Sequence, residues 1–205
     1  MKRPFVALLS LICIALAIAV FLPDARPVQA GGGQKAEAQE VTDGSNAADY
    51  CVKKGGEVND RQPFYNTNDV EQNWLRLSGS TQFCKFLSKK DGSRIYAELS
   101  TLYTEEPSLA ALAYYAEVTY NGNCNGNPAS CYCSQLGGSD LFGGINAAGG
   151  GWVKKSDPDD PVLEACIFPD MSTIDSWGLF YHSAGIIRGK DLSKVLRFAN
   201  PYGTK

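Results

Sequence analysis

The spacing of cysteine is the feature of this sequence that most constrains its fold. Beyond residue 30 the chain contains six cysteines. The interval from Cys51 to Cys133 is the same as the interval from Cys84 to Cys166. An even number of cysteines in an exported chain is typical of a disulfide framework. The common offset further predicts that this framework is duplicated.

The sequence around these cysteines recurs, which predicts two copies of one unit, residues 45–120 and 127–203. Each first cysteine is followed within a few residues by Gly-Gly, and each second cysteine lies in a short apolar stretch, F-C-K-F or A-C-I-F. With small gaps the match extends to Trp74 and Trp152. We assign these two tryptophans as equivalent positions and as core anchors.

Two copies with the same fold are each expected to contain the equivalent disulfide, which reduces the number of possible cysteine pairings. The two cysteines present only in the second copy are close enough in sequence to close a small loop. A thiolate metal site is the alternative there, but C-x6-C-x-C lacks the usual C-x2-C pairs of structural zinc sites. No metal or other cofactor is therefore expected. The expected pairs are Cys51–Cys84, Cys133–Cys166 and Cys124–Cys131.

Residues 1–30 have the pattern of a secretory signal. Lys2 and Arg3 precede an uncharged apolar run over residues 5–22, and a small residue, Ala30, ends the segment. An uncleaved membrane anchor is the alternative, because an apolar run of this length can just span a bilayer. Residues 31–44 are small and polar, which predicts a flexible linker. We expect a secreted or periplasmic protein, or one that touches the membrane only through an N-terminal anchor.

The fold class expected is α+β, with two tandem repeats that each contain a short helix, a β-hairpin and one or two further helices. Asn127 and Pro128 are suited to the start of a helix. The strand patterns predict hairpins from 74–77 with 81–87 and from 151–155 with 162–168. An isolated hairpin is marginal, so the two hairpins can be expected to share one antiparallel sheet. Further helices are expected over 95–103, 108–115, 173–181 and 192–199.

The second copy resembles a small bacterial family, the domain of unknown function 333, whose members are often labelled haemolysin-like. The family pattern, N-P-A-x-x-Y-C-x-x-x-G-G and then C-x-F-P-D-G-S, is matched by residues 127–138 and 166–170. Trp177 and Tyr181 match the aromatic positions that follow. Met171 departs from the pattern, where the family has glycine. The resemblance implies an exported location and no particular activity.

Composition and motifs argue against several function classes. A formal net charge of −3 and a pI near 5.2 give no basic footprint for nucleic acid. His182 is the only histidine in the sequence, so a metal site with two imidazoles is excluded. The acidic run over 157–160 lacks the spacing of a calcium loop and is interpreted as a solvated turn.

The function expected is a non-enzymatic binding or envelope-structural module whose partner is a protein or another envelope component. The candidate binding residues are those that keep the family pattern: Phe168, Pro169, Asp170 and Trp177. One alternative is an inhibitor of a secreted hydrolase that presents residues 168–170 as a rigid loop. The other is a hydrolase that uses either His182 as its base or a pair of carboxyl groups.

Overall fold

The computed structural model describes residues 44–140 and 149–203. The predicted signal sequence and residues 31–43 of the predicted linker lie outside these ranges. Among the described residues, no helix has both the length and the apolar character that crossing a membrane requires.

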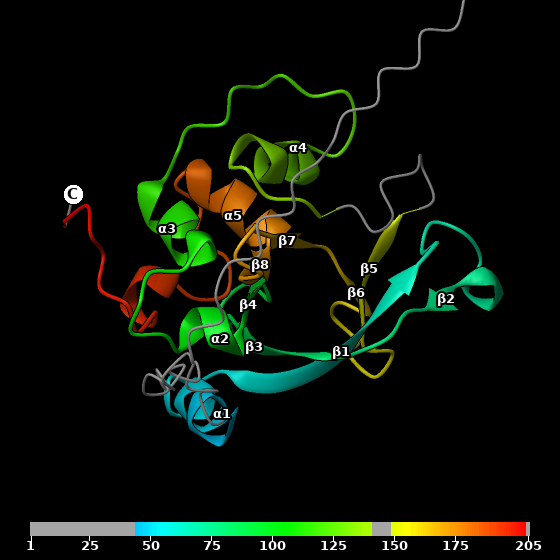
Figure 1. The fold of residues 1–205 in the computed structure, drawn as a ribbon, viewed down its shortest axis with the longest axis horizontal. Helices are drawn as coiled ribbons and strands as arrows, with labels where there is room; N and C mark the ends of the chain where they lie inside the picture. Colours follow the sequence, from blue (N-terminus) through cyan, green and yellow to red (C-terminus); the bar gives the residue numbers. More distant parts are fainter. Residues whose placement is uncertain (1–43, 141–148, 204–205) are drawn as a thin grey trace, which may run out of the picture. The chain divides into compact units, whose positions relative to one another are not determined.

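The strands form one antiparallel sheet in the order β6-β5-β1-β3-β4-β8-β7, and β2 adds to one end of β1 (Figure 1). The first half of β1 pairs with β3, and its second half pairs with β5 and β2. β1 therefore links the two ends of the sheet. The strands are β1 (Glu57–Tyr65), β2 (Leu75–Arg76), β3 (Thr81–Leu87), β4 (Arg94–Glu98), β5 (Gly150–Val153), β6 (Val162–Leu163), β7 (Ala165–Ile167) and β8 (Thr173–Asp175).

Helices pack on one face of this sheet, and Figure 1 shows α3, α4 and α5 gathered near β4, β8 and β7. The main core lies between these layers and includes Ile95, Ala97 and Ile174 from the strands and Leu102 and Leu179 from the helices. The helices are α1 (Gly44–Lys53), α2 (Leu99–Leu102), α3 (Leu109–Ala116), α4 (Pro128–Gln135) and α5 (Ser176–Ser183), with short 3-10 turns η1 (Glu71–Asn73) and η3 (Leu192–Lys194).

Side-chain caps mark the start of several of these helices, including α3 and α4. Asn127 accepts a hydrogen bond from the Ala129 N–H at the start of α4, as its position before Pro128 predicts. Ser108 accepts a hydrogen bond from the Ala111 N–H at the start of α3. Each cap satisfies a backbone donor that has no partner within its own helix.

The three disulfides are those expected from the sequence: Cys51–Cys84, Cys124–Cys131 and Cys133–Cys166. The first joins α1 to β3, and the third joins α4 to β7. Beside each of these two disulfides lies a glycine, at a position where a larger side chain would clash with a cysteine sulfur. A Cβ at Gly56 would lie 2.3 Å from the Cys84 Sγ, and one at Gly138 would lie 2.4 Å from the Cys166 Sγ.

The strand register follows one pattern around both of these disulfides. Glu57 pairs with Lys85 beside the first disulfide, and Ser139 pairs with Ile167 beside the second. Both partners are displaced by the interval that separates the equivalent cysteines. Likewise, Cys84 pairs with Ala97, and Cys166 pairs with Ile174. β4 and β8 meet in the middle, where Ala97 pairs with Ile174.

The first expected hairpin is wrong, because β2 pairs with β1 and not with β3. β1 escapes sequence detection because its buried positions include Asn59, Arg61 and Pro63 in place of apolar residues. The second expected hairpin is present as β5 paired with β6, but Cys166 lies on the separate strand β7.

The equivalence of Trp74 and Trp152 is also wrong. The Trp74 indole N–H donates to the Asp69 carbonyl, and its ring contacts Phe64 edge-on. Trp152 lies within β5 and packs edge-on against Phe83. Three expected helices differ as well. Residues 94–98 form β4, residues 173–175 form β8, and only residues 192–194 of the last stretch are helical, as η3.

The second face of the sheet is covered by the loop between β5 and β6, which a buried ion network holds in place. Asp157 accepts hydrogen bonds from Arg61 and Lys85 at 2.7 Å each and from the Tyr96 hydroxyl at 3.0 Å. Lys85 also donates to Asp159 at 2.7 Å. The acidic run is therefore not simply a solvated turn. It neutralises two cations that β1 and β3 place on this face.

Candidate functional site

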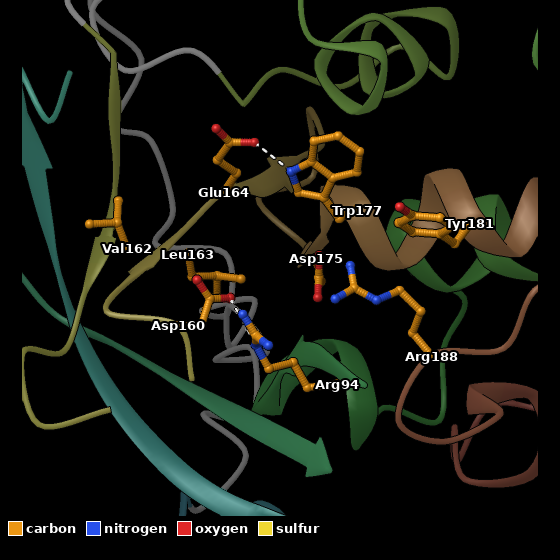
Figure 2. A pocket seen from close by; sticks show the side chains of 9 residues that line it. All are labelled: Arg94, Asp160, Val162, Leu163, Glu164, Asp175, Trp177, Tyr181 and Arg188. Atoms are coloured by element: carbon orange, nitrogen blue, oxygen red, sulfur yellow. Dashed lines mark hydrogen bonds and ion pairs between the residues drawn. The ribbon is translucent and has the colours of Figure 1, made fainter. Parts of the chain in front are cut away.

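A pocket of about 350 Å³ lies between β4, the β5–β6 loop and α5. Figure 2 shows its polar side chains converging from strands, a helix and a loop that are distant in sequence. Its walls contain two arginines, three carboxyl groups, two aromatic rings and two apolar side chains. They are Arg94, Arg188, Asp160, Glu164, Asp175, Trp177, Tyr181, Val162 and Leu163.

The secondary structure fixes the position of each polar group. Arg94 begins β4, and Asp175 ends β8, where its side chain accepts a hydrogen bond from the Gly178 N–H and caps α5. Trp177 and Tyr181 are one turn apart on α5, so they lie on the same side of that helix. The loop that carries Arg188 is bound to the start of β4, because the Gly189 N–H donates a hydrogen bond to the Ser93 Oγ at 3.0 Å.

Both guanidinium groups have donors that no described residue occupies. The Arg94 Nε lies 3.7 Å from an Asp160 carboxylate oxygen, an ion-pair distance that is too long for a hydrogen bond. Arg188 stacks its guanidinium 5.0 Å from the Tyr181 ring centre and forms no hydrogen bond or ion pair with a described residue. Arg94 therefore brings to the pocket a charge that is paired with Asp160 but not hydrogen-bonded, and Arg188 brings a guanidinium without a hydrogen bond to a described residue.

Burial shifts the acidity of two of the carboxyl groups. Burial of Asp175 raises its pKa to about 7, although the hydrogen bond from Gly178 opposes this. Burial likewise raises the pKa of Asp160, although the charges of Arg94 and Arg61 oppose it. Asp175 is thus partly protonated near neutral pH, which lowers the negative charge that these groups place in the pocket.

Glu164 and Trp177 form the opposite wall, in the upper part of Figure 2. One Glu164 carboxylate oxygen accepts hydrogen bonds from the Trp177 indole N–H at 3.0 Å and from the Asn127 side-chain amide at 2.7 Å. The other carboxylate oxygen accepts none from a described residue. The indole is held in a fixed orientation, and one acceptor of Glu164 stays available.

The four residues expected to form a binding site are not brought together. Trp177 lines the pocket, whereas Phe168 is buried in the main core and Pro169 is exposed. Asp170 is engaged elsewhere: one carboxylate oxygen accepts from the Leu109 N–H at 2.7 Å at the start of α3. The other accepts from Ser172. Asp170 thus joins the β7–β8 turn to a helix.

His182 lies away from this pocket. It is 8% exposed, its ring stacks on Tyr114 at a centroid distance of 3.8 Å, and its Nε2 lies 3.6 Å from a Glu117 carboxylate oxygen. It lines a separate cavity of about 230 Å³. Within residues 44–140 and 149–203, no cluster of three or more histidine, cysteine, aspartate or glutamate side chains is arranged to hold a metal ion.

A larger cavity of about 970 Å³ adjoins the pocket through Glu164 and Val162, which line both. Its wall includes Asp140 and Gly149, the residues on either side of the segment that the structure does not describe. The arginines of the smaller pocket do not reach this cavity, so the two spaces differ in charge.

Sequence analysis missed the residues that define the pocket other than Trp177. Arg94 and Arg188 lie far apart in the sequence, and no local pattern connects them. The one available signal was the pair of aromatic residues at positions 177 and 181, whose spacing places both on one side of a helix.

Comparison of the chain with protein-family models, with curated proteins and with solved structures found no match. The resemblance of residues 127–203 to the domain of unknown function 333 stays a prediction.

Proposed function

We propose that this chain is an exported binding protein, stabilised by disulfides and without catalytic activity of its own, that holds a small organic anion. The observation that carries this proposal is the pair Arg94 and Arg188, whose guanidinium groups line one pocket without a hydrogen bond to a described residue. We call this site the arginine pocket, defined by the nine lining residues given above.

A carboxylate or similar oxyanion matches the arginine pocket chemically. A guanidinium presents planar N–H donors that suit the oxygen atoms of a carboxylate, and such charge-assisted hydrogen bonds are stronger than neutral ones. The volume of about 350 Å³ lies at the lower end of the range for small-molecule sites. Tyr181 orients Arg188 by stacking, so less side-chain freedom is lost on binding.

The proposed location rests on the three disulfides, which are typical of secreted and periplasmic proteins. The lining of the arginine pocket contains no serine, threonine, cysteine or histidine, which argues against a nucleophile of these types beside a base. The inhibitor alternative has less support, because Phe168 is buried and Asp170 is bonded to α3.

We also propose that the chain arose by duplication of one unit, as the cysteine spacing predicts. The equivalent register of β1–β3–β4 and of Ser139–β7–β8 supports this, as do the two equivalent bridges. In an experimental structure, residues 44–98 and 127–175 are expected to superpose with their disulfides aligned. A different register around Cys84 and Cys166 would contradict the duplication.

Calorimetric titration with a panel of small carboxylates tests the proposed function. Wild-type protein is expected to bind at least one of them, and Arg188→Gln is expected to weaken binding about tenfold or more, because one charge-assisted contact is lost. Arg76→Gln is the matched control, since Arg76 is an exposed arginine on β2 that does not line the pocket. Equal weakening by both variants, or no binding by the wild type, would refute the proposal.

A further inference from the structure

We propose that the ligand of the arginine pocket is an acidic monosaccharide, a sugar ring that carries one carboxylate and several hydroxyl groups. This inference rests on the proposed function and names the ligand class of the same site. In this arrangement Arg94 and Arg188 hold the carboxylate, Trp177 packs against the ring, and Glu164 accepts a hydrogen bond from a hydroxyl group.

The mixture of charges in the arginine pocket argues against a bare oxyanion. Three carboxyl groups, Asp160, Glu164 and Asp175, line the same cavity as the two arginines. Sulfate or acetate would satisfy the guanidinium groups but would offer no donor to the acceptor oxygens, and close approach to Glu164 would be repulsive. A ligand with both an anionic group and O–H donors leaves neither set of protein groups unmatched.

Glu164 and the two guanidinium groups lie at opposite ends of the pocket, which suits a ligand of extended size, whereas Asp160 lies beside Arg94. In Figure 2 the guanidinium groups lie in the lower part of the view, and Glu164 and Trp177 lie in the upper part. The open carboxylate oxygen of Glu164 is an acceptor whose side chain is already fixed by Trp177 and Asn127. Because the Glu164 side chain is already ordered, it loses little conformational entropy when it binds a ligand hydroxyl group.

Trp177 supplies the apolar wall that a sugar ring requires. Its indole is fixed by the bond to Glu164 and by an edge-on contact with Phe180, with ring centres 5.9 Å apart. Val162 and Leu163 line the same cavity. A preformed pocket with an aromatic face and a few convergent polar groups is the usual design of a small-molecule site.

A neutral sugar and an apolar carboxylic acid each match only half of these groups. A neutral sugar brings no counter-charge for Arg188, which forms no ion pair with a described residue, and an apolar acid brings no donor for the open carboxylate oxygen of Glu164. A site built to hydrogen-bond a ligand rejects an analogue that lacks the matching group, because its polar groups are then left unpaired. The structure therefore favours a ligand that combines both features.

The test titrates the full folded chain with four probes: glucuronate, glucose, cyclohexanecarboxylate and glutamate. The readouts are calorimetry and the NMR signal of the Trp177 indole N–H, assigned through a Trp177→Phe variant. Glucuronate is expected to bind about tenfold or more tightly than each of the other three probes and to shift the Trp177 signal. Arg188→Gln is expected to weaken glucuronate binding about tenfold or more. Arg188→Lys is expected to have an intermediate affinity, because lysine keeps the positive charge but lacks the planar pair of N–H donors.

The outcomes separate this inference from the proposed function. Equal binding of cyclohexanecarboxylate and glucuronate would overturn the sugar-acid inference and leave the anion-binding function standing. Tighter binding of glutamate would overturn it in favour of a zwitterionic ligand, and tighter binding of glucose would overturn both proposals. Failure of all four probes to bind would also overturn both. Circular dichroism of each variant shows whether a loss of binding reflects loss of the fold.

Discussion

Replacing Asp157 with alanine is expected to be one of the most destabilising single changes in this chain. The carboxylate neutralises Arg61, whose side chain is 0% exposed, and Lys85, whose side chain is 6% exposed. Without Asp157, Arg61 keeps hydrogen bonds only to Asn59, the Trp152 carbonyl and the Tyr96 hydroxyl, and none of these carries a counter-charge. The β5–β6 loop would also lose its main tie to the sheet.

The expected loss is about 3–5 kcal/mol, which is the usual cost of removing one partner of a buried ion pair. Lys85 retains Asp159, so the larger part of the cost falls on Arg61. A loss of this size is a large fraction of the ~5–15 kcal/mol by which domains are typically stable. Urea unfolding followed by tryptophan fluorescence measures it.

Two further variants make this reasoning refutable. Glu71→Ala removes an exposed partner of Lys155 and is expected to cost no more than about 1 kcal/mol. The double variant Asp157→Ala with Arg61→Met removes the buried anion together with its most buried cation, and it is expected to recover much of the loss. A loss below about 1 kcal/mol for Asp157→Ala, in the range of an exposed pair, or no recovery in the double variant, would refute the account of the network.

The same structure predicts four further effects. The pKa of Asp175 is raised to about 7 in the folded protein, so its contribution to the free energy of unfolding is present below its unfolded pKa of about 4 and is lost as pH rises through 7. Asp175→Asn is expected to make the free energy of unfolding in urea less dependent on pH over that range. An unchanged pH dependence would contradict the assignment. Ligand affinity is expected to fall over the same rise in pH, because ionised Asp175 repels the anion, and calorimetry at pH 6 and pH 8 checks this. Asp170→Ala is expected to cost about 1 kcal/mol through the lost bond to α3, measured by urea unfolding, whereas no loss would mean that the bond contributes nothing. Gly138→Ala is expected to cost about 1–3 kcal/mol by overpacking against the disulfide of Cys166, and a neutral effect in thermal unfolding would show that the backbone can move away.

Local signals in the sequence predicted the local parts of this fold. The cap at Asn127 and the helix from Ser108 are short-range features, and the structure contains both. The disulfide pairs could be predicted because a duplicated spacing reduces the number of possible pairings.

The parts of the fold that the sequence did not predict depend on charge pairing between residues that are far apart in the chain. β1 places Asn59 and Arg61 on a buried face, and a polar strand of this kind is stable only because Asp157 supplies the counter-charge. That partner is 96 residues away, beyond any periodicity argument. The arginine pocket could not be predicted for the same reason. A resemblance drew attention to the β7–β8 turn, whereas the arginine pocket is assembled by tertiary pairing of Arg94 with the segment after α5.

The most direct test of the central claim is to observe the side chains of the arginine pocket while a carboxylate binds. In NMR spectra of labelled protein, the Nε–H signals of Arg94 and Arg188 are assigned through single arginine-to-glutamine variants. Saturating glucuronate is expected to shift both signals and to leave that of Arg76, on the distant β2, unchanged. Shifts confined to Arg76 and other exposed arginines, or no shift at Arg94 and Arg188, would contradict the account.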